Sequence, residues 1–102
     1  MTIKWVKVDP LVMNGEPFCY GSRVTVRQVL EMRRAGATVT DLLKDNPELR
    51  LMGIANAYAY AGTHRETYAE FFGADGSLVG PGLDAGEAAQ LPASLRIAGV
   101  VV

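Results

Sequence analysis

The chain has 102 residues, of which 49% are hydrophobic, and its 10 Lys and Arg against 11 Asp and Glu give a net charge of −1. This length and composition predict a single globular domain with one core and exclude disorder over most of the chain. The near-neutral charge argues against a protein whose affinity rests mainly on neutralising phosphates.

The N-terminal part is predicted to form a β-hairpin. Residues 3–8 are rich in β-branched and aromatic side chains and stop at Asp9-Pro10, which is typical of a strand. Asn14-Gly15 is a turn signal, and residues 17–20 are a candidate second strand. Cys19 lies in this second strand, where we expect a buried and unreactive thiol.

Two short helices are predicted after the hairpin. Thr25 and Gln28 have the spacing of a capping box, which indicates a helix over about 26–35 that ends at Gly36. Thr38 opens a second helix over 39–45 in the same way. The Asn-Pro pair that follows position 45 ends it, because the residue before a proline resists the helical conformation.

A third helix is predicted over about 50–61, where apolar residues recur at spacings of three and four. Gly62-Thr63 is expected to interrupt it. Thr63 and Glu66 again have capping-box spacing, so a fourth helical piece is predicted to reach Phe72.

The C-terminal third has a different amino-acid composition from the rest of the chain. Residues 73–82 are rich in glycine and predict a loop, followed by one helical turn over about 84–90. The segment 95–102 favours β-structure and would be an aggregation-prone edge if left unpaired. We therefore expect it to pair with the N-terminal strand or with a partner subunit. The expected interface residues are Leu95, Ile97, Val100, Val101 and Val102.

The predicted fold is mostly α with a small β part. It has an N-terminal β-hairpin, three to four short helices in a helix-turn-helix-like arrangement, and a C-terminal β segment. Residues 1–72 are expected to form the main domain. Residues 73–102 are either part of the same compact domain or a dimerisation arm.

Catalysis is not expected. Cys19 and His64 are the only cysteine and histidine, so an intramolecular disulfide and a Cys/His zinc site are excluded. Their spacing gives no support to a nucleophilic pair, and the carboxylates are scattered. The glycine-rich segment has no phosphate-loop motif. We predict no catalytic residue, no metal site and no cofactor.

Nucleic-acid binding has some support from the three successive helices, because a third helix could enter the major groove of DNA. The spacing alone favours an ordinary three-helix packing unit. Arg50 and Asn56 are the candidates for contacts with base edges. The candidates for contacts with the DNA backbone are Arg23, Arg27, Arg33 and Arg34. The alternative is a solvated helix face in which Arg27, Glu31 and Arg34 pair with one another.

A series of short motifs carries a family resemblance over residues 3–66. Gly15-Glu16-Pro17, Gly21-Ser22-Arg23-Val24 and Asn46-Pro47-Glu48-Leu49 occur in this order, after Asp9-Pro10. The chain resembles domain-of-unknown-function family 433 of bacteria and archaea, many of whose members are described as antitoxins of VapB type.

The resemblance implies a cytoplasmic, helix-turn-helix-type domain encoded beside a PIN-like ribonuclease toxin, which it would bind and neutralise. Binding to its own operator DNA would follow if the helices contact DNA, and a homodimer is expected. The absence of a signal peptide or a membrane-spanning run fits this location, with no membrane partner. The alternative function is a self-associating structural module that has neither a toxin nor DNA as a partner.

Overall fold

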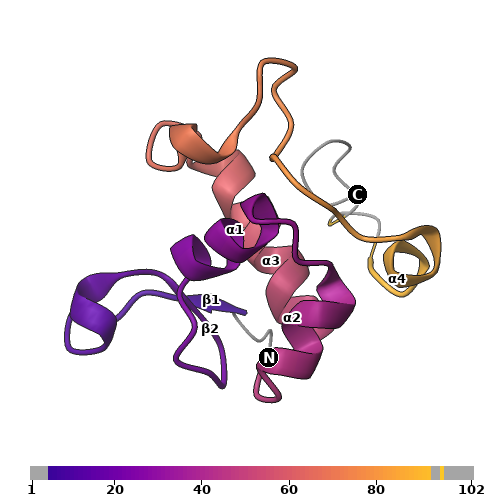
Figure 1. The fold of residues 1–102 in the computed structure, drawn as a ribbon. Helices are drawn as coiled ribbons and strands as arrows, with labels where there is room; N and C mark the ends of the chain where they lie inside the picture. The colour runs from indigo at the N-terminus through magenta and orange to yellow at the C-terminus, as the bar shows by residue number, and fades with distance from the viewer. Residues whose placement is uncertain (1–4, 93–94, 96–102) are drawn as a thin grey trace.

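The computed structural model describes residues 5–92 and 95 (Figure 1). It confirms the predicted mostly helical fold with a small antiparallel hairpin at the N-terminus. Two short 3-10 turns, over Met13–Gly15 and Ala69–Phe71, complete it. The strands and α-helices are β1 (Val6–Lys7), β2 (Phe18–Cys19), α1 (Val26–Arg34), α2 (Val39–Asp45), α3 (Leu51–Thr63) and α4 (Ala85–Ala89).

The hairpin pairs β1 with β2 so that Val6 lies opposite Cys19. Within the described residues both strands are shorter than predicted, although the Tyr20 N–H still donates to the Trp5 carbonyl at 2.8 Å beyond their ends. Past β2, the chain folds back along that strand, and the Cys19 N–H donates to the Val24 carbonyl at 2.9 Å. The far edge of β2 is therefore occupied by the segment that leads into α1.

The first two helices begin and end where the local sequence predicts. Thr25 and Thr38 each cap the helix that follows them, and both capping boxes form. At the end of α1, the Gly36 N–H donates to the Arg33 carbonyl and the Ala37 N–H to the Met32 carbonyl, each at 3.0 Å. This pair of bonds is the glycine-terminated motif that satisfies the last carbonyls of a helix.

The capping box of α2 predicts a pH dependence of stability. Hydrogen bonds from the backbone and hydroxyl groups of Thr38 hold the pKa of the Asp41 carboxyl below its usual value. The stabilisation is therefore complete above the unfolded pKa of about 4 and is lost as the pH falls through the folded pKa. We expect Asp41→Asn to lower the free energy of unfolding in urea at pH 7 and to have less effect at pH 3. Asp45→Asn, at the other end of α2, is the control, and equal losses for Asp41→Asn at both pH values would contradict the account.

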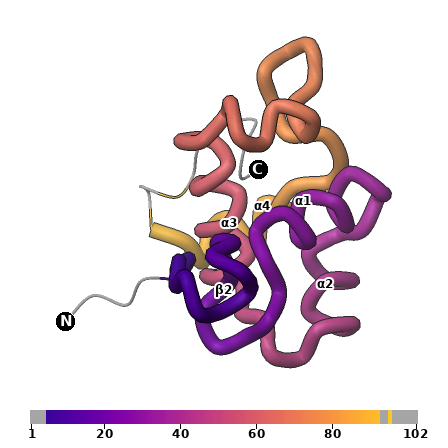
Figure 2. The backbone as a smooth tube through the Cα atoms, turned by 90° about the vertical axis from the view of Figure 1, so that its left-hand side faces the viewer, coloured from indigo at the N-terminus to yellow at the C-terminus, as the bar shows by residue number. Residues whose placement is uncertain are grey.

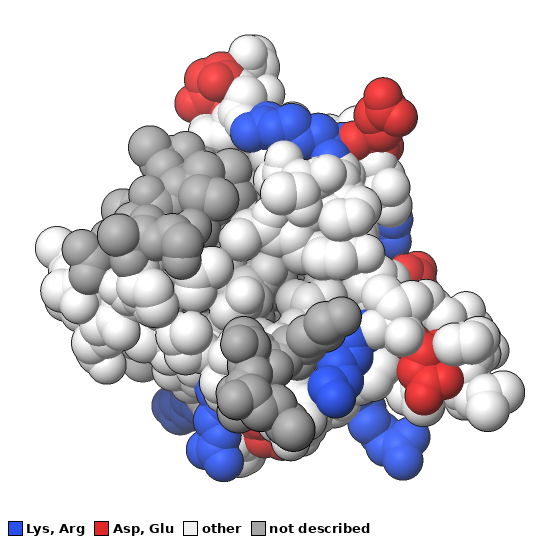
Figure 3. All heavy atoms as spheres, turned by 180° about the vertical axis from the view of Figure 1, so that it is seen from behind, with Lys and Arg blue, Asp and Glu red and all other residues white. Residues whose placement is uncertain are grey.

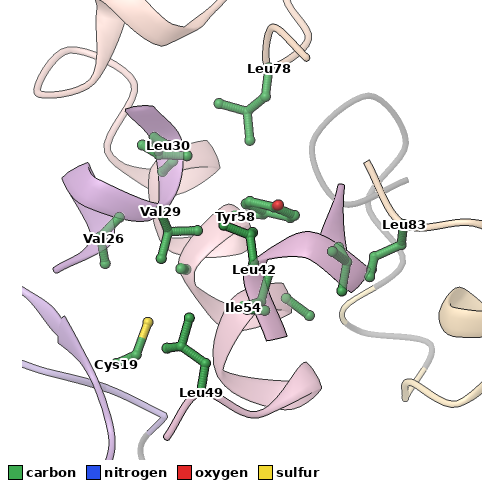
Figure 4. Close-up of a cluster of buried hydrophobic side chains, with 14 of the residues drawn as sticks. Cys19, Val26, Val29, Leu30, Leu42, Leu49, Ile54, Tyr58, Leu78 and Leu83 are labelled. Carbon is green, nitrogen blue, oxygen red and sulfur yellow. The ribbon is translucent and has the colours of Figure 1, made fainter. Parts of the chain in front are cut away.

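Helix α3 is the centre of the fold. It packs against α1, α2 and both strands. The side chains of Ile54 and Tyr58 are fully buried, and every residue from 51 to 62 is buried or partly buried. Figure 4 shows these two side chains surrounded by residues of α1, α2 and the hairpin.

The predicted break at Gly62-Thr63 is wrong, because α3 continues through Thr63. The Thr63 hydroxyl donates to the Tyr60 carbonyl at 3.0 Å, inside its own helix, and so does not cap a new one. The His64 ring stacks on Tyr60 with the ring centres 3.9 Å apart. The fourth helical piece predicted to reach Phe72 is replaced by turns and the 3-10 turn at Ala69–Phe71.

The glycine-rich segment packs on the same core. Leu78 in this segment and Leu83 and Leu91 just after it are buried, and Figure 4 shows Leu78 pointing toward Tyr58. The predicted helical turn is present as α4, with Asp84 as its cap. Leu95 is partly buried against the core, whereas the other predicted interface residues, Ile97, Val100, Val101 and Val102, lie outside the described residues.

None of the helices in the described part of the chain combines the length and the hydropathy that crossing a bilayer requires.

Candidate partner-binding surface

The arginines at the two ends of α1 hold the chain that follows α3. Arg27 forms an ion pair with Glu70 and lies 3.9 Å from Glu16 of the hairpin loop. Arg34 donates to the Glu70 carbonyl at 3.4 Å, and its guanidinium lies 4.6 Å from the centre of the Phe71 ring. These two candidate DNA-backbone contacts are thus engaged within the protein, and Arg27 pairs with distant residues in place of the expected Glu31.

Arg33 lies in the core instead of on the surface. Only 2% of the residue is exposed, and its guanidinium stacks 4.5 Å from the centre of the Tyr58 ring. It also donates to the Leu78 carbonyl at 3.4 Å. Burial lowers the pKa of Arg33, and the neighbouring Tyr58 opposes this shift. A phosphate can reach this guanidinium only if the segment around Leu78 moves away.

Helix α3, the predicted recognition helix, exposes few polar side chains that could contact DNA. Arg50 is exposed just before α3, but Asn56 is partly buried and donates to the Met52 carbonyl of its own helix at 2.7 Å. On the face shown in Figure 3, Lys and Arg side chains lie at several places along the edge, some of them beside Asp or Glu. A base-reading helix needs several exposed polar side chains, and α3 lacks them.

The hairpin carries most of the exposed apolar surface. Four large hydrophobic residues are exposed in the described part of the chain, and three of them belong to the hairpin: Leu11 at 93%, Val8 at 58% and Tyr20 at 43%. The fourth is Val79, at 40%. Figure 2 shows the hairpin and its loop on the side that faces the viewer. Clustered exposed apolar residues mark interaction sites more often than isolated ones do.

A groove of about 840 Å³ runs along this part of the molecule, and we call it the hairpin groove. Its apolar lining includes Leu11, Met13, Phe18 and Tyr20, and its charged lining is Lys7, Arg23 and Glu48. A smaller hollow of about 360 Å³, between α1 and the end of α2, adjoins it and shares Arg23 and Glu48. Arg23 is exposed at this junction and is the one predicted DNA-backbone arginine that lines the grooves.

The loop that presents Leu11 is tightly folded. Asp9 accepts two bonds, from the Leu11 N–H to its carboxylate and from the Val12 N–H to its carbonyl, each at 2.9 Å. Met13 and Asn14 have φ angles of 54° and 56°, a left-handed conformation that costs about 1–2 kcal/mol for a residue with a Cβ. Such strain concentrates at functional sites. The predicted turn at Asn14-Gly15 lies in this loop, but the exposed apolar surface beside it was not predicted, although the apolar run between Pro10 and Asn14 was a usable signal.

Cys19 and His64 lie too far apart to act together. Cys19 is buried, and its Sγ lies 3.8 Å from the carbonyl oxygen of Gly53, near the start of α3. His64 is exposed at the other end of that helix, 11 positions after Gly53, or about 16 Å along the helix axis. Among the described residues there is also no group of three or more potential metal ligands.

Burial raises the pKa of the Cys19 thiol to about 12. At pH 8 the folded protein then holds roughly a thousandth of the thiolate of an unfolded chain. We expect Ellman's reagent to leave the native protein unmodified over minutes and to modify one thiol per chain at once in 6 M guanidinium chloride. Rapid reaction of the native protein would contradict the placement of Cys19 in the core.

The sequence comparisons identify a family that spans the hairpin and the first helices. Residues 6–61 match the model of a family described as "Protein of unknown function (DUF433)". No curated protein and no solved structure matches the chain. The matched range contains the whole lining of the hairpin groove and stops before the end of α3.

Proposed function

The chain belongs to the DUF433 family of proteins of unknown function, and from this premise we propose that it is an antitoxin-like, non-catalytic protein that binds and neutralises a PIN-like ribonuclease toxin. The observation that carries the proposal is the hairpin groove, with its exposed apolar residues on a tightly folded loop. Binding of this kind needs a surface and no reacting group in the chain itself.

The chemistry of the surface favours a protein as the partner. An apolar side chain that is fully exposed gains about 1.5–3 kcal/mol when a partner covers it, and Leu11 is such a side chain. The loop already holds its conformation, so binding orders few groups. Operator DNA receives less support, because α3 is covered and Arg27, Arg33 and Arg34 make contacts within the protein.

Co-expression tests the proposal. The product of the neighbouring gene is tagged, captured and assayed for ribonuclease activity on a single-stranded RNA, with and without this chain. We expect a complex at micromolar concentration and a ribonuclease activity that falls to zero as the chain is titrated in. A neighbouring ribonuclease that neither binds the chain nor loses activity would contradict the proposal.

Self-association is the second candidate function, and the exposure of Val8, Leu11 and Tyr20 in a single copy favours it. Light scattering of the wild type and of Leu11→Asp distinguishes the two functions. A dimer that becomes a monomer in the variant supports self-association, and a monomer in both supports a different partner.

A further inference from the structure

We propose that the hairpin groove receives an apolar segment of the partner protein that carries an acidic side chain, and that Lys7 and Arg23 recognise this acid. The inference rests on the proposed function and specifies the chemistry of the bound segment. It follows from the distribution of charge around the groove.

The groove has an excess of positive charge in a chain whose net charge is −1. Lys7 and Arg23 line it, against the single acidic residue Glu48. Both basic residues are exposed. The Lys7 Nζ lies 4.9 Å from the centre of the Tyr20 ring, which places this charge beside the apolar lining.

The acidic residues of the hairpin loop are engaged elsewhere. The Asp9 carboxylate accepts the Leu11 N–H at 2.9 Å, inside the loop. Glu16 lies 3.9 Å from Arg27 of α1. Neither lines the groove, so they do not balance Lys7 and Arg23 there.

The positive excess selects among the proteins that could occupy the groove. Two copies related by a two-fold axis would bring two such patches together, each with two basic residues and one acidic residue, so one basic residue of each copy would lack an acidic partner. Like charges placed together disfavour such a dimer. An apolar segment with Asp or Glu beside it would pack against Leu11, Met13 and Phe18 and would pair its carboxylate with the two basic residues.

Charge-reversal variants test the inference. Lys7→Glu and Arg23→Glu change two exposed residues of the groove, and Lys44→Glu makes the same charge change on α2, outside the lining of both hollows. Affinity for the purified product of the neighbouring gene is measured by titration calorimetry at 50 and 300 mM NaCl. We expect each groove variant to bind at least tenfold more weakly than the wild type and Lys44→Glu to stay within about twofold. We expect the higher salt concentration to weaken binding by the wild type more than binding by the double variant that carries both Lys7→Glu and Arg23→Glu.

The outcomes separate this inference from the proposed function. If the wild type does not bind the neighbouring gene product, the proposed function fails. If it binds and the groove variants behave like Lys44→Glu, or bind more tightly, the inference is overturned while the proposed function stands. Thermal unfolding checks that each variant is folded. The milder Lys7→Gln or Arg23→Gln replaces a variant that does not fold, and a smaller loss of affinity is then expected. A wild-type dimer that Lys7→Glu dissociates would identify a second copy as the occupant and also overturn the inference.

Discussion

Replacing Gly80 with alanine is expected to lower the free energy of unfolding by about 3 kcal/mol or more. A Cβ at this position would lie 1.9 Å from the carbonyl oxygen of Arg33 and 2.6 Å from its carbonyl carbon. Both are backbone atoms at the end of α1, which cannot rotate away as a side chain can. The glycine-rich segment would have to leave its place on the core.

Gly36→Ala is the matched control. Gly36 has a φ of 104°, close to the 99° of Gly80, but a Cβ there meets nothing within 4 Å. The control therefore has only the conformational cost of a left-handed residue, about 1–2 kcal/mol. Denaturation in urea measures both variants. Equal losses would show that the close approach of Gly80 to Arg33 does not contribute.

The contact between Gly80 and Arg33 also indicates that the glycine-rich segment folds together with the helices. Arg33 lies between the Tyr58 ring of α3 and the Leu78 carbonyl of the glycine-rich segment. Residues beyond the family match at 6–61 thus complete the core of the matched part. We expect wild-type unfolding to be a single transition by fluorescence and by circular dichroism, as for other small domains.

Leu11→Asp is expected to weaken binding to the proposed ribonuclease partner at least 100-fold and to leave the fold intact. The side chain is 93% exposed, so the domain loses no packing. In the complex, the variant would bury a carboxylate where the partner covers an apolar group, and an unpaired buried charge is costly. Titration calorimetry with the neighbouring gene product measures the loss.

Val79→Asp is the control for Leu11→Asp. Among the described residues, Val79 is the exposed large hydrophobic residue outside the hairpin, at 40%, and it does not line the hairpin groove. Its substitution introduces the same carboxylate, and we expect the affinity to stay within about threefold of the wild type. An equal loss for both variants would indicate a general effect of charge, and no loss for Leu11→Asp would place the partner on another face.

Sequence reasoning succeeded where the determinants of structure are local. The capping residues Thr25 and Thr38 and the terminating Gly36 satisfy backbone groups within four residues of themselves, so their patterns predict helix ends directly. It failed at Thr63, whose hydroxyl can either cap a helix that follows it or donate to a carbonyl of the preceding turn. The choice depends on whether α3 is held in place by the core, which short-range spacing does not reveal.

The candidate site was harder to predict, because exposure depends on the tertiary structure. Arg33 continues the buried stripe of Val26, Val29 and Leu30 at helical spacing, and this position identifies its burial better than its residue type does. Leu11 is the opposite case, an apolar residue left in solvent by a loop that folds on itself. Asn14-Gly15 indicates the turn, but the groove beside it could not be derived from the residue pattern.

Amide hydrogen exchange, measured on the chain alone and in complex with the proposed ribonuclease partner, tests most directly whether the hairpin groove is the binding surface. We predict new protection in residues 7–23 and around Glu48, and little change in the interior of α3, which is already covered in the free protein. Protection confined to Arg50 and α3, or to the segment from 73 to 92, would contradict the account.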